Sequence, residues 1–249
     1  MPLKPLKWYK NCATKKGRLE AGAFLVEGDR AIKQVIGTHP DEIIEIIAIE
    51  KPSPAYHNYS IRHVTDSQFR SISQTKTPQG IIAVVRLPRN TFSDSLPNTT
   101  GTKILLLEDI QDPGNVGTLI RTAAAFNFSG VILSDKCADP LSQKCIQSTA
   151  GTVLSVWIRK TTRYLEFVDK LKKNGYSLIA ADLKGMKDSS MLYNQDKLLL
   201  ALGNEASGLS ESILNASNHR FQIPIIRQRA ESLNVAVCGA ICMYLSSCK

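Results

Sequence analysis

The sequence lacks the signatures of several common protein classes. None of its apolar runs approaches the ~18–20 residues that a membrane-spanning helix requires, so no membrane association is expected. It contains neither GxGxxG nor GxxxxGKS/T, the glycine-rich loops that usually hold dinucleotides and nucleoside triphosphates. Its six cysteines include no CxxC pair and no histidine at zinc spacing, so no metal site is predicted. Such unpaired cysteines are typical of a reducing compartment, and we expect a cytoplasmic location.

Basic residues are in excess. The 249 residues include 31 Lys+Arg and 22 Asp+Glu, a formal net charge of +9, and residues 1–90 alone carry 14 and 8 of these, a net of +6. This balance favours an anionic partner, with nucleic acid first. A basic protein without such a partner is the alternative that composition leaves open. The basic side chains expected to contact a nucleic-acid backbone are Lys4, Lys7, Lys10, Lys15, Lys16 and Arg18.

Residues 91–101 are rich in Ser, Thr, Asn, Pro and Gly, which predicts a linker between two domains. In residues 1–90 short apolar runs alternate with helical patterns, so we expect a smaller α/β domain there. Its predicted strands are residues 24–26, 43–49, 61–64 and 80–86, and its predicted helices are residues 29–36 and 66–72.

Residues 102–249 repeat this alternation with longer elements. The strands predicted from apolar runs are residues 104–107, 131–133, 178–181, 198–202 and 221–225. The helices predicted between and after them are residues 115–126, 140–150, 163–174, 207–216 and 233–246. Strand and helix in alternation indicate an α/β domain with a parallel sheet covered by helices on both faces. Ligands of such domains bind beyond the carboxyl ends of the strands.

Polar side chains interrupt apolar sequence at three element boundaries. Asn115 occupies an expected N-cap, and Arg121 lies almost two turns further into a segment of Ala, Leu and Ile. The residues 203–205, Gly-Asn-Glu, directly follow a buried strand, and Ser232 and Asn234 flank a leucine at the head of the last helix. Helix capping explains each segment taken alone, with Ser232 as a candidate N-cap. Because buried polar groups need partners, we interpret the three segments as one assembled site.

Taken together, the three segments resemble the motifs of the SpoU (TrmH-like) family of RNA ribose 2'-O-methyltransferases. The first resembles N-x-G-x-x-x-R, and the second resembles G-N-E with a following glycine. The third resembles I-P followed by S-L-N-V-A-V. The residues that carry the three matches are Asn115, Gly117 and Arg121, then Gly203, Asn204, Glu205 and Gly208, then Ile223, Pro224 and residues 232–237. The resemblance covers residues 103–247.

The N-terminal part is similar to the ribosomal-protein-like domain with which this family binds its substrate, on residues 22–28 and 77–81. The resemblance therefore implies a substrate-binding domain in residues 1–90 and a methyltransferase domain in residues 102–249. For the second domain it implies a deep trefoil knot, an exception to ordinary chain topology. It also implies S-adenosylmethionine as the cofactor, RNA as the substrate and a homodimer formed through the C-terminal domain.

The resemblance also implies which residues form the site. Those expected against the cofactor are Leu202, Gly203, Ile223, Leu233 and Asn234. The expected catalytic set is Arg121, Asn115, Glu205, Ser232 and Asn234. Arg121 is the family's candidate for activating the hydroxyl. Because a free guanidinium has a pKa above ~12 and is a poor base, we interpret Arg121 as an electrostatic clamp on a phosphate or ribose. Glu205 is expected to orient Arg121 or to accept a hydrogen bond from the ribose.

One segment departs from the family pattern. Members usually have a glycine between I-P and S-L-N, whereas residues 225–230 of this chain read Ile-Ile-Arg-Gln-Arg-Ala and contain one extra residue. This loop is expected to border the cofactor, and Arg227 and Arg229 are candidates for contacts with RNA.

Three alternatives stay open at this stage. A non-catalytic RNA-binding assembly factor with this fold would have no need of all five expected catalytic residues. A base methyltransferase is disfavoured by the first motif, which is that of ribose methylation. The RNA itself is not identified by the sequence, and we favour ribosomal RNA over transfer RNA because relatives with two domains of this kind more often act on it.

Overall fold

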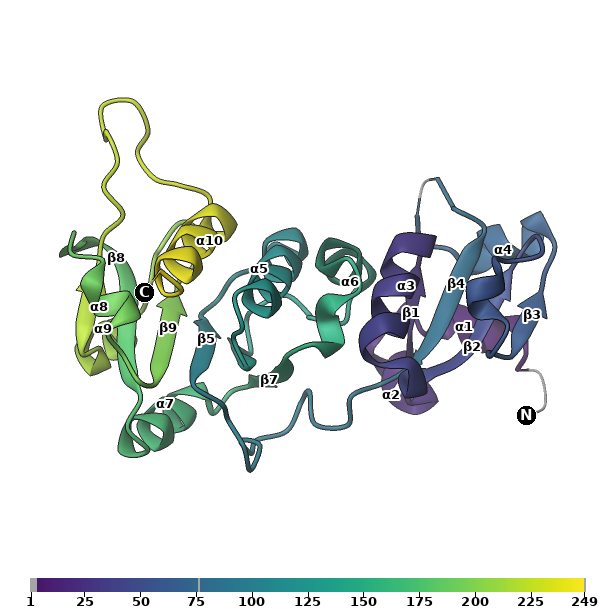
Figure 1. The fold of residues 1–249 in the computed structure, drawn as a ribbon, viewed down its shortest axis with the longest axis horizontal. Coiled ribbons are helices and arrows are strands. Elements are labelled where there is room, and N and C mark those ends of the chain that lie inside the picture. The colour runs from purple at the N-terminus through teal and green to yellow at the C-terminus, as the bar shows by residue number, and fades with distance from the viewer. Residues whose placement is uncertain (1–3, 76, 249) are drawn as a thin grey trace. The chain divides into compact units, whose positions relative to one another are not determined.

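The structure, a computed structural model, describes residues 4–75 and 77–248 (Figure 1). The chain divides into two compact units. Unit 1 comprises Met1–Arg89 together with Asp139–Leu154, and unit 2 comprises Asn90–Ala138 together with Ser155–Lys249. Across the described residues, no helix combines the length and the apolar character needed to cross a membrane.

Unit 1 contains a four-stranded sheet with the order β1-β4-β2-β3. The strands are β1 (Ala23–Glu27), β2 (Ile43–Ala48), β3 (Ile61–His63) and β4 (Ile81–Arg86). β4 runs antiparallel to both neighbours, and β2 and β3 are parallel. The helices are α1 (Leu6–Asn11), α2 (Lys15–Ala21), α3 (Asp29–Thr38), α4 (Asp66–Ile72) and α6 (Gln143–Thr149), with short 3-10 turns at Pro40–Glu42, Pro54–Tyr56 and Thr152–Leu154.

Helices cover both faces of this sheet, and all five residues of β1 are buried. Tyr9 of α1 and Phe69 of α4 pack with Leu25 and Val84 on one face, while α3 contacts β1 and β4 on the other (Figure 1). The predicted α/β character of the N-terminal part is confirmed. Helices α1 and α2 were not predicted, because Lys and Gly interrupt the apolar pattern of this basic segment.

The segment Asp139–Leu154 belongs to unit 1 by its contacts, although in sequence it lies within residues 102–249. Its helix α6 contacts β1, and its residues Cys145 and Ile146 are buried. Arg18 of α2, only 3% exposed, forms an ion pair with Asp139. Gly151 has a φ of 91°, and a Cβ there would lie 2.3 Å from the backbone oxygen of Ala31. Buried charge and close backbone contact therefore fix this segment within unit 1.

Unit 2 contains a six-stranded sheet with the order β10-β8-β9-β5-β6-β7, and every pair in it is parallel. The strands are β5 (Lys103–Leu107), β6 (Gly130–Ser134), β7 (Trp157–Thr161), β8 (Ser177–Met186), β9 (Leu198–Leu202) and β10 (His219–Phe221). The helices are α5 (Pro113–Ala125), α7 (Tyr164–Lys173), α8 (Ser190–Tyr193), α9 (Glu211–Ala216) and α10 (Val235–Leu245).

The predicted parallel sheet of the C-terminal part is confirmed. Phe167 of α7 and Ile213 of α9 pack on the strands in one apolar cluster, and α5 and α10 pack together (Figure 1). Strand β7 was not predicted from the sequence, because Arg159 and Lys160 interrupt its apolar run. The predicted strand at residues 221–225 was misplaced, because the pairing of β10 ends at Phe221.

The predicted linker, residues 91–101, contains no helix or strand and packs within unit 2. Thr91 is 1% exposed, and its carbonyl accepts a hydrogen bond of 2.7 Å from the backbone nitrogen of Lys160. Further along, Arg159 Nε donates to the carbonyl of Ser95 at 2.7 Å. Arg159, which interrupts the apolar pattern of β7, thus holds residues 91–101 in place.

Candidate functional site

A cavity of about 430 Å³ opens in unit 2 at the carboxyl ends of β8 and β9. Parallel strands bring their carboxyl ends to the same edge of a sheet, which is where α/β domains bind ligands. The walls are formed by the end of β8, the loop after β9, the segment after β10 and the start of α10. The predicted site residues in these walls are Leu202, Gly203, Glu205, Ile223, Ser232 and Leu233. Four of the five residues expected against the cofactor therefore line the cavity.

The loop after β9 is a closed turn. Asn204 and Gly208 exchange backbone hydrogen bonds of 3.1 and 2.9 Å. The Asn204 side chain accepts hydrogen bonds from the backbone nitrogens of Ala206 and Ser207 at 2.9 and 3.1 Å. Gly208 has a φ of 71°, and a Cβ on Gly203 would lie 2.3 Å from the carbonyl carbon of Gly208. The two glycines of the second motif are therefore required by a left-handed backbone and by a close approach of backbone to backbone.

One chain of hydrogen bonds joins the three motifs. Asn115 Nδ2 donates to Glu205 Oε1 at 2.8 Å, and Asn234 Nδ2 donates to Asn115 Oδ1 at 3.1 Å. Asn115 thus connects the loop after β9 to the start of α10, from segments about 90 and 119 residues away in the chain. The interpretation of the three segments as one assembled site is in keeping with this geometry.

Two predicted helix caps were wrong. The N-cap of α5 is Asp112, whose Oδ1 accepts from the backbone nitrogens of Gly114 and Asn115 at 2.6 and 3.0 Å. Asn115 therefore lies inside the helix, and its amide is available for Glu205. The N-cap of α10 is Asn234, whose Oδ1 accepts from Ala236 at 2.9 Å, and Ser232 precedes it in an exposed loop. In both cases a neighbouring side chain that reaches two amides takes the cap.

Arg121 is exposed on α5 and does not line the cavity. In the sequence it lies within a segment of Ala, Leu and Ile, but its helical position turns it to solvent while Leu119 and Ile120 are buried. The hydrogen bond that orients Glu205 comes from Asn115. At 3.6 residues per turn, Arg121 and Asn115 project about 120° apart around the helix axis.

The glycine-free segment, residues 225–230, lies in the long loop between β10 and α10, which projects from the rest of unit 2 (Figure 1). Arg227 Nη2 donates to the carbonyl of Leu183 at 2.5 Å, and Leu183 lines the cavity. Arg229 is exposed. Arg227 therefore fastens the loop to the end of β8, beside the cavity.

The cavity carries both signs of charge. Asp182 and Arg220 form a wide ion pair of 3.7 Å on its wall. Cys238 of α10 also lines it, and the buried Cys242 lies one turn along the helix. Hydrogen bonding with Cys238 and burial raise the pKa of the Cys242 thiol, so it stays protonated near neutral pH. Within the part of the chain that the structure describes, no three His, Cys, Asp or Glu side chains gather to hold a metal ion.

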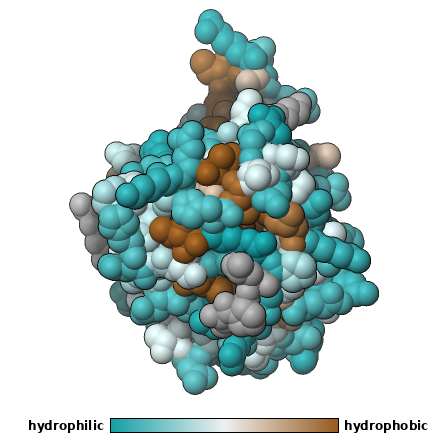
Figure 2. All heavy atoms as spheres, turned by 90° about the vertical axis from the view of Figure 1, so that its right-hand side faces the viewer, coloured by the Kyte–Doolittle hydropathy of each residue, from teal (hydrophilic) through white to brown (hydrophobic). Residues whose placement is uncertain are grey.

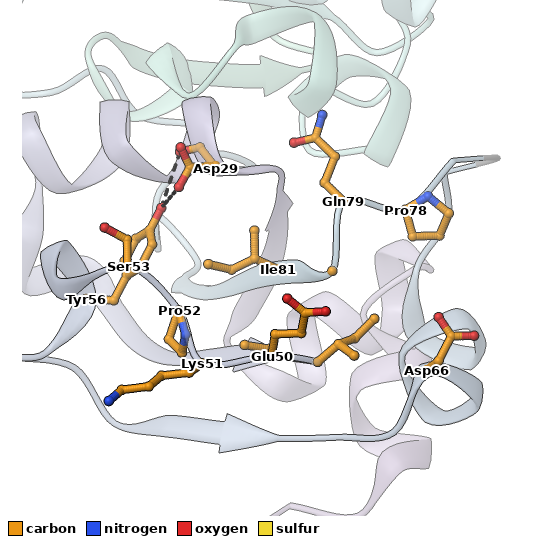
Figure 3. A pocket seen from close by; sticks show the side chains of 13 residues that line it. Asp29, Glu50, Lys51, Pro52, Ser53, Tyr56, Asp66, Pro78, Gln79 and Ile81 are labelled. Atoms are coloured by element: carbon orange, nitrogen blue, oxygen red, sulfur yellow. Dashed lines mark hydrogen bonds between the residues drawn. The ribbon is translucent and has the colours of Figure 1, made fainter.

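A second cavity, of about 480 Å³, lies in unit 1 among α3, the end of β2 and the start of β4 (Figure 3). Its carboxylates serve the fold: Asp29 accepts from the Tyr56 hydroxyl at 2.6 Å, and Asp66 pairs with Arg70 at 2.7 Å. Glu50 and Lys51 also line this cavity, and Lys33 pairs with Asp29 at 2.7 Å. None of the predicted site residues lies there, so the cavity of unit 2 is the candidate site.

Known proteins resemble the chain over nearly its whole length. The SpoU rRNA methylase family model matches residues 102–244, and the MRM3-like substrate binding domain model matches residues 5–83. The 23S rRNA (guanosine(2553)-2'-O)-methyltransferase RlmP of Bacillus subtilis (strain 168) is 30% identical over 242 residues, which cover 96% of this chain and 94% of that protein. An uncharacterized tRNA/rRNA methyltransferase of Synechocystis is 28% identical, with 92% and 85% covered.

Solved structures agree with this. The AdoMet-bound rRNA methyltransferase from Sinorhizobium meliloti superimposes with a TM-score of 0.80 at 26% identity, covering 97% of this chain and 93% of that one. The SpoU methyltransferase AviRb from Streptomyces viridochromogenes, in complex with AdoMet, has a TM-score of 0.81, with 97% and 96% covered. At 22% identity the second comparison bears on the fold alone.

Proposed function

We propose that this chain, which belongs to the SpoU rRNA methylase family, uses S-adenosylmethionine to methylate a ribose 2'-hydroxyl of ribosomal RNA. The observation that carries the proposal is the hydrogen-bonded chain Glu205–Asn115–Asn234 beside a cavity at the carboxyl ends of the strands. The relative RlmP, whose name states this reaction on 23S rRNA, supports the choice of ribose and of ribosomal RNA. The expected cytoplasmic site of action is part of this proposal, and the ribosomal RNA substrate named for RlmP is in keeping with it.

The cavity suits the cofactor by its chemistry. Leu202, Ile223 and Leu233 supply apolar walls, and Gly203 lines the cavity beside them. These residues would hold the adenosine and the methionine parts. Asn234 caps α10 at this edge and fixes the place of Leu233 beside it. When bound, S-adenosylmethionine supplies a methyl group on a sulfonium, which is transferred by in-line displacement.

Residues of this chain orient the ribose 2'-hydroxyl, which accepts the methyl group, and assist the removal of its proton. Glu205, exposed and oriented by Asn115, accepts a hydrogen bond from the ribose hydroxyl. Arg121 acts as a clamp on the neighbouring phosphate or ribose and lowers the cost of the developing alkoxide charge. Ser232, exposed at the rim of the cavity, contributes a further donor for the substrate.

A dimer supplies the setting for Arg121. Helix α10 is apolar all round, and its Val237 and Tyr244 stay 49% and 57% exposed in the single chain. Its partner helix α5 carries Arg121 on an exposed position. If this apolar surface were buried against a second copy of the chain, Arg121 would come closer to the remaining site residues. We therefore propose that the homodimer contact lies on α5 and α10. The trefoil knot stays a prediction of the family resemblance.

Unit 1 is the part proposed to bind RNA. The exposed lysines of its first two helices support this, whereas Arg18 is unavailable because it is buried against Asp139. The surface that Figure 2 shows is mostly hydrophilic, with some apolar side chains near its centre. We assign the contacts with the RNA backbone to these exposed lysines. The lysines in question are Lys4, Lys7, Lys10, Lys15 and Lys16.

The deciding experiment incubates the protein with methyl-labelled S-adenosylmethionine and, in parallel, ribosomal and transfer RNA from cells that lack the gene. We expect a labelled 2'-O-methyl nucleoside from ribosomal RNA. A methylated base would replace the ribose assignment, label in transfer RNA alone would replace the substrate, and no product would favour the non-catalytic assembly factor.

Arg121→Ala tests the clamp, with Arg163→Ala as the matched control. Arg163 is an exposed arginine of unit 2 paired with Glu166 at 2.6 Å. The first variant should lose transfer while cofactor binding persists, and the control should keep both. Near-normal transfer by Arg121→Ala with unchanged cofactor binding would exclude Arg121 both as a clamp and as a base.

A further inference from the structure

A buried carboxylate lies next to the loop after β9, seven residues before the N-x-G-x-x-x-R pattern of the first motif. Glu108 directly follows β5 and is 3% exposed. Its Oε1 accepts hydrogen bonds from the hydroxyls of Tyr164 and Ser210, each at 2.7 Å. Its Oε2 accepts from the backbone nitrogen of Ser210, also at 2.7 Å. All three contacts present hydrogen to the carboxylate, so both of its oxygens have partners away from water.

Burying the carboxylate of Glu108 costs free energy, which its contacts must offset. Burying a charge without partners is strongly unfavourable, and even a satisfied one is often no better than an apolar side chain. An apolar residue after β5 would fill the same space. The two contacts with Ser210 indicate which segment Glu108 fixes in place. Ser210 is the N-cap of α9 and ends the loop after β9.

Glu108 holds both ends of that loop. Its backbone nitrogen donates to the carbonyl of Leu202 at 2.9 Å, where β9 ends, and its carboxylate holds Ser210 where α9 begins. The next residue holds the middle, because the carbonyl of Asp109 accepts from Asn204 Nδ2 at 2.8 Å. Asp109 adopts a left-handed φ of 58° and exchanges hydrogen bonds with the Ser134 hydroxyl.

The loop held in this way is the wall of the candidate site. All seven residues from Gly203 to Leu209 line the cavity, and Glu205 is one of them. The two residues that follow β5 therefore hold the loop by hydrogen bonds at its start, its middle and its end.

We propose that Glu108 is a positioning residue, which keeps the loop 203–209 in the shape that binds the cofactor. The inference rests on the proposed function. Glu108 does not line the cavity, and it acts through Ser210. Loosening this contact lets the start of α9 and the loop separate from β5, so the cavity loses its formed wall and cofactor affinity falls. Methyl transfer at saturating cofactor is affected less.

Two hydroxyls on the same carboxylate provide a matched pair of variants. Ser210→Ala removes the donor that belongs to the loop, and Tyr164→Phe removes the donor that belongs to α7. Both leave Glu108 in place and both cost it one hydrogen bond at the same distance. Ser210→Ala also removes the N-cap contact of α9, in which Ser210 Oγ accepts from the Ile213 backbone nitrogen at 3.4 Å. A role confined to folding therefore predicts that any change in cofactor affinity follows each variant's loss of thermal stability.

The measurement is the Kd of S-adenosylmethionine by calorimetry without RNA, together with kcat and KM for the cofactor. We expect Kd and KM to rise about tenfold in Ser210→Ala, equal to ~1.4 kcal/mol, with kcat within about twofold. Tyr164→Phe should stay within about twofold of the parent protein. Ser210→Thr, which keeps the hydroxyl and the cap, should restore affinity. Glu108→Gln should resemble Ser210→Ala.

The outcomes separate this inference from the proposed function. Absence of cofactor binding by the parent protein overturns the proposed function itself. Binding by the parent protein with equal Kd values for Ser210→Ala and Tyr164→Phe overturns the role of Glu108 alone. A rise in Kd for both variants that matches their loss of thermal stability likewise overturns it, because a general loosening of the fold would then account for the data.

Discussion

Asn115 is the link on which the proposed catalytic site depends, and its removal gives a quantitative test. Asn115→Ala deletes the donor to Glu205 at 2.8 Å and the acceptor from Asn234 at 3.1 Å. A hydrogen bond to a charged group contributes about 1.5–3 kcal/mol and a neutral one about 0.5–1.5 kcal/mol. Because both contacts are open to solvent, we take the lower ends, which sum to about 2 kcal/mol.

If the chain of contacts positions Glu205 for the reaction, about 2 kcal/mol of transition-state stabilisation corresponds to a ~30-fold fall in kcat/KM. The free energy of unfolding should fall by at most about the same 2 kcal/mol, because the two hydrogen bonds are already formed without substrate. Steady-state transfer of labelled methyl groups and thermal unfolding measure the two quantities. Thr118→Ala, an exposed change one turn along α5, serves as the control and should affect neither.

A double-mutant cycle locates the effect. Combining Asn115→Ala with Glu205→Ala should cost less than the sum of the single changes, with a coupling of about 1–2 kcal/mol in the transition state. Full additivity would show that the hydrogen bond carries no catalytic role. Activity of Asn115→Ala within about twofold of the parent protein would refute the assignment of the whole chain Glu205–Asn115–Asn234.

Three further outcomes are expected. Gly203→Ala should abolish measurable cofactor binding in calorimetry, since its Cβ would meet the backbone of Gly208 at 2.3 Å, whereas Gly37→Ala, with nothing within 4 Å, should leave binding intact. Unit 1 should lose stability as pH rises from about 10 to about 12. Burial and the hydrogen bond to Glu45 raise the pKa of Tyr9 from 10.0 to about 12, so unfolding releases a proton in that window, and Tyr9→Phe should flatten the fall in alkaline melting curves. Lys7→Glu should weaken RNA binding at low salt and reduce the slope of log K against log salt by about 1, with cofactor Kd unchanged.

The role of unit 1 is better tested by such surface changes than by truncation. Deleting residues 1–90 looks from the sequence like the removal of one domain. In the structure it would leave Asp139–Leu154 without the rest of its unit, expose Cys145 and Ile146, and strip Asp139 of Arg18. A truncated protein that aggregates would therefore say nothing about RNA.

The apolar runs determined most of the fold by themselves. Buried parallel strands must be apolar on both faces, so residues such as Leu198–Leu202 stand out in any reading of the sequence. The same principle brought the motifs together, since polar groups that follow parallel strands share one edge of the sheet. Where a strand departs from this rule, as β7 does at Arg159, the sequence pattern failed.

The tertiary structure decided what depends on contacts between distant residues. Asp112 and Asn115 can each cap α5, and only the approach of Glu205 determines that Asn115 has another use. In the sequence, Glu108 is one acidic residue among several. Its importance comes from its burial beside Ser210, which lies 102 residues away in the chain. Local patterns record the periodicity of single elements. Partners for buried polar groups are selected only when the chain has brought those elements together.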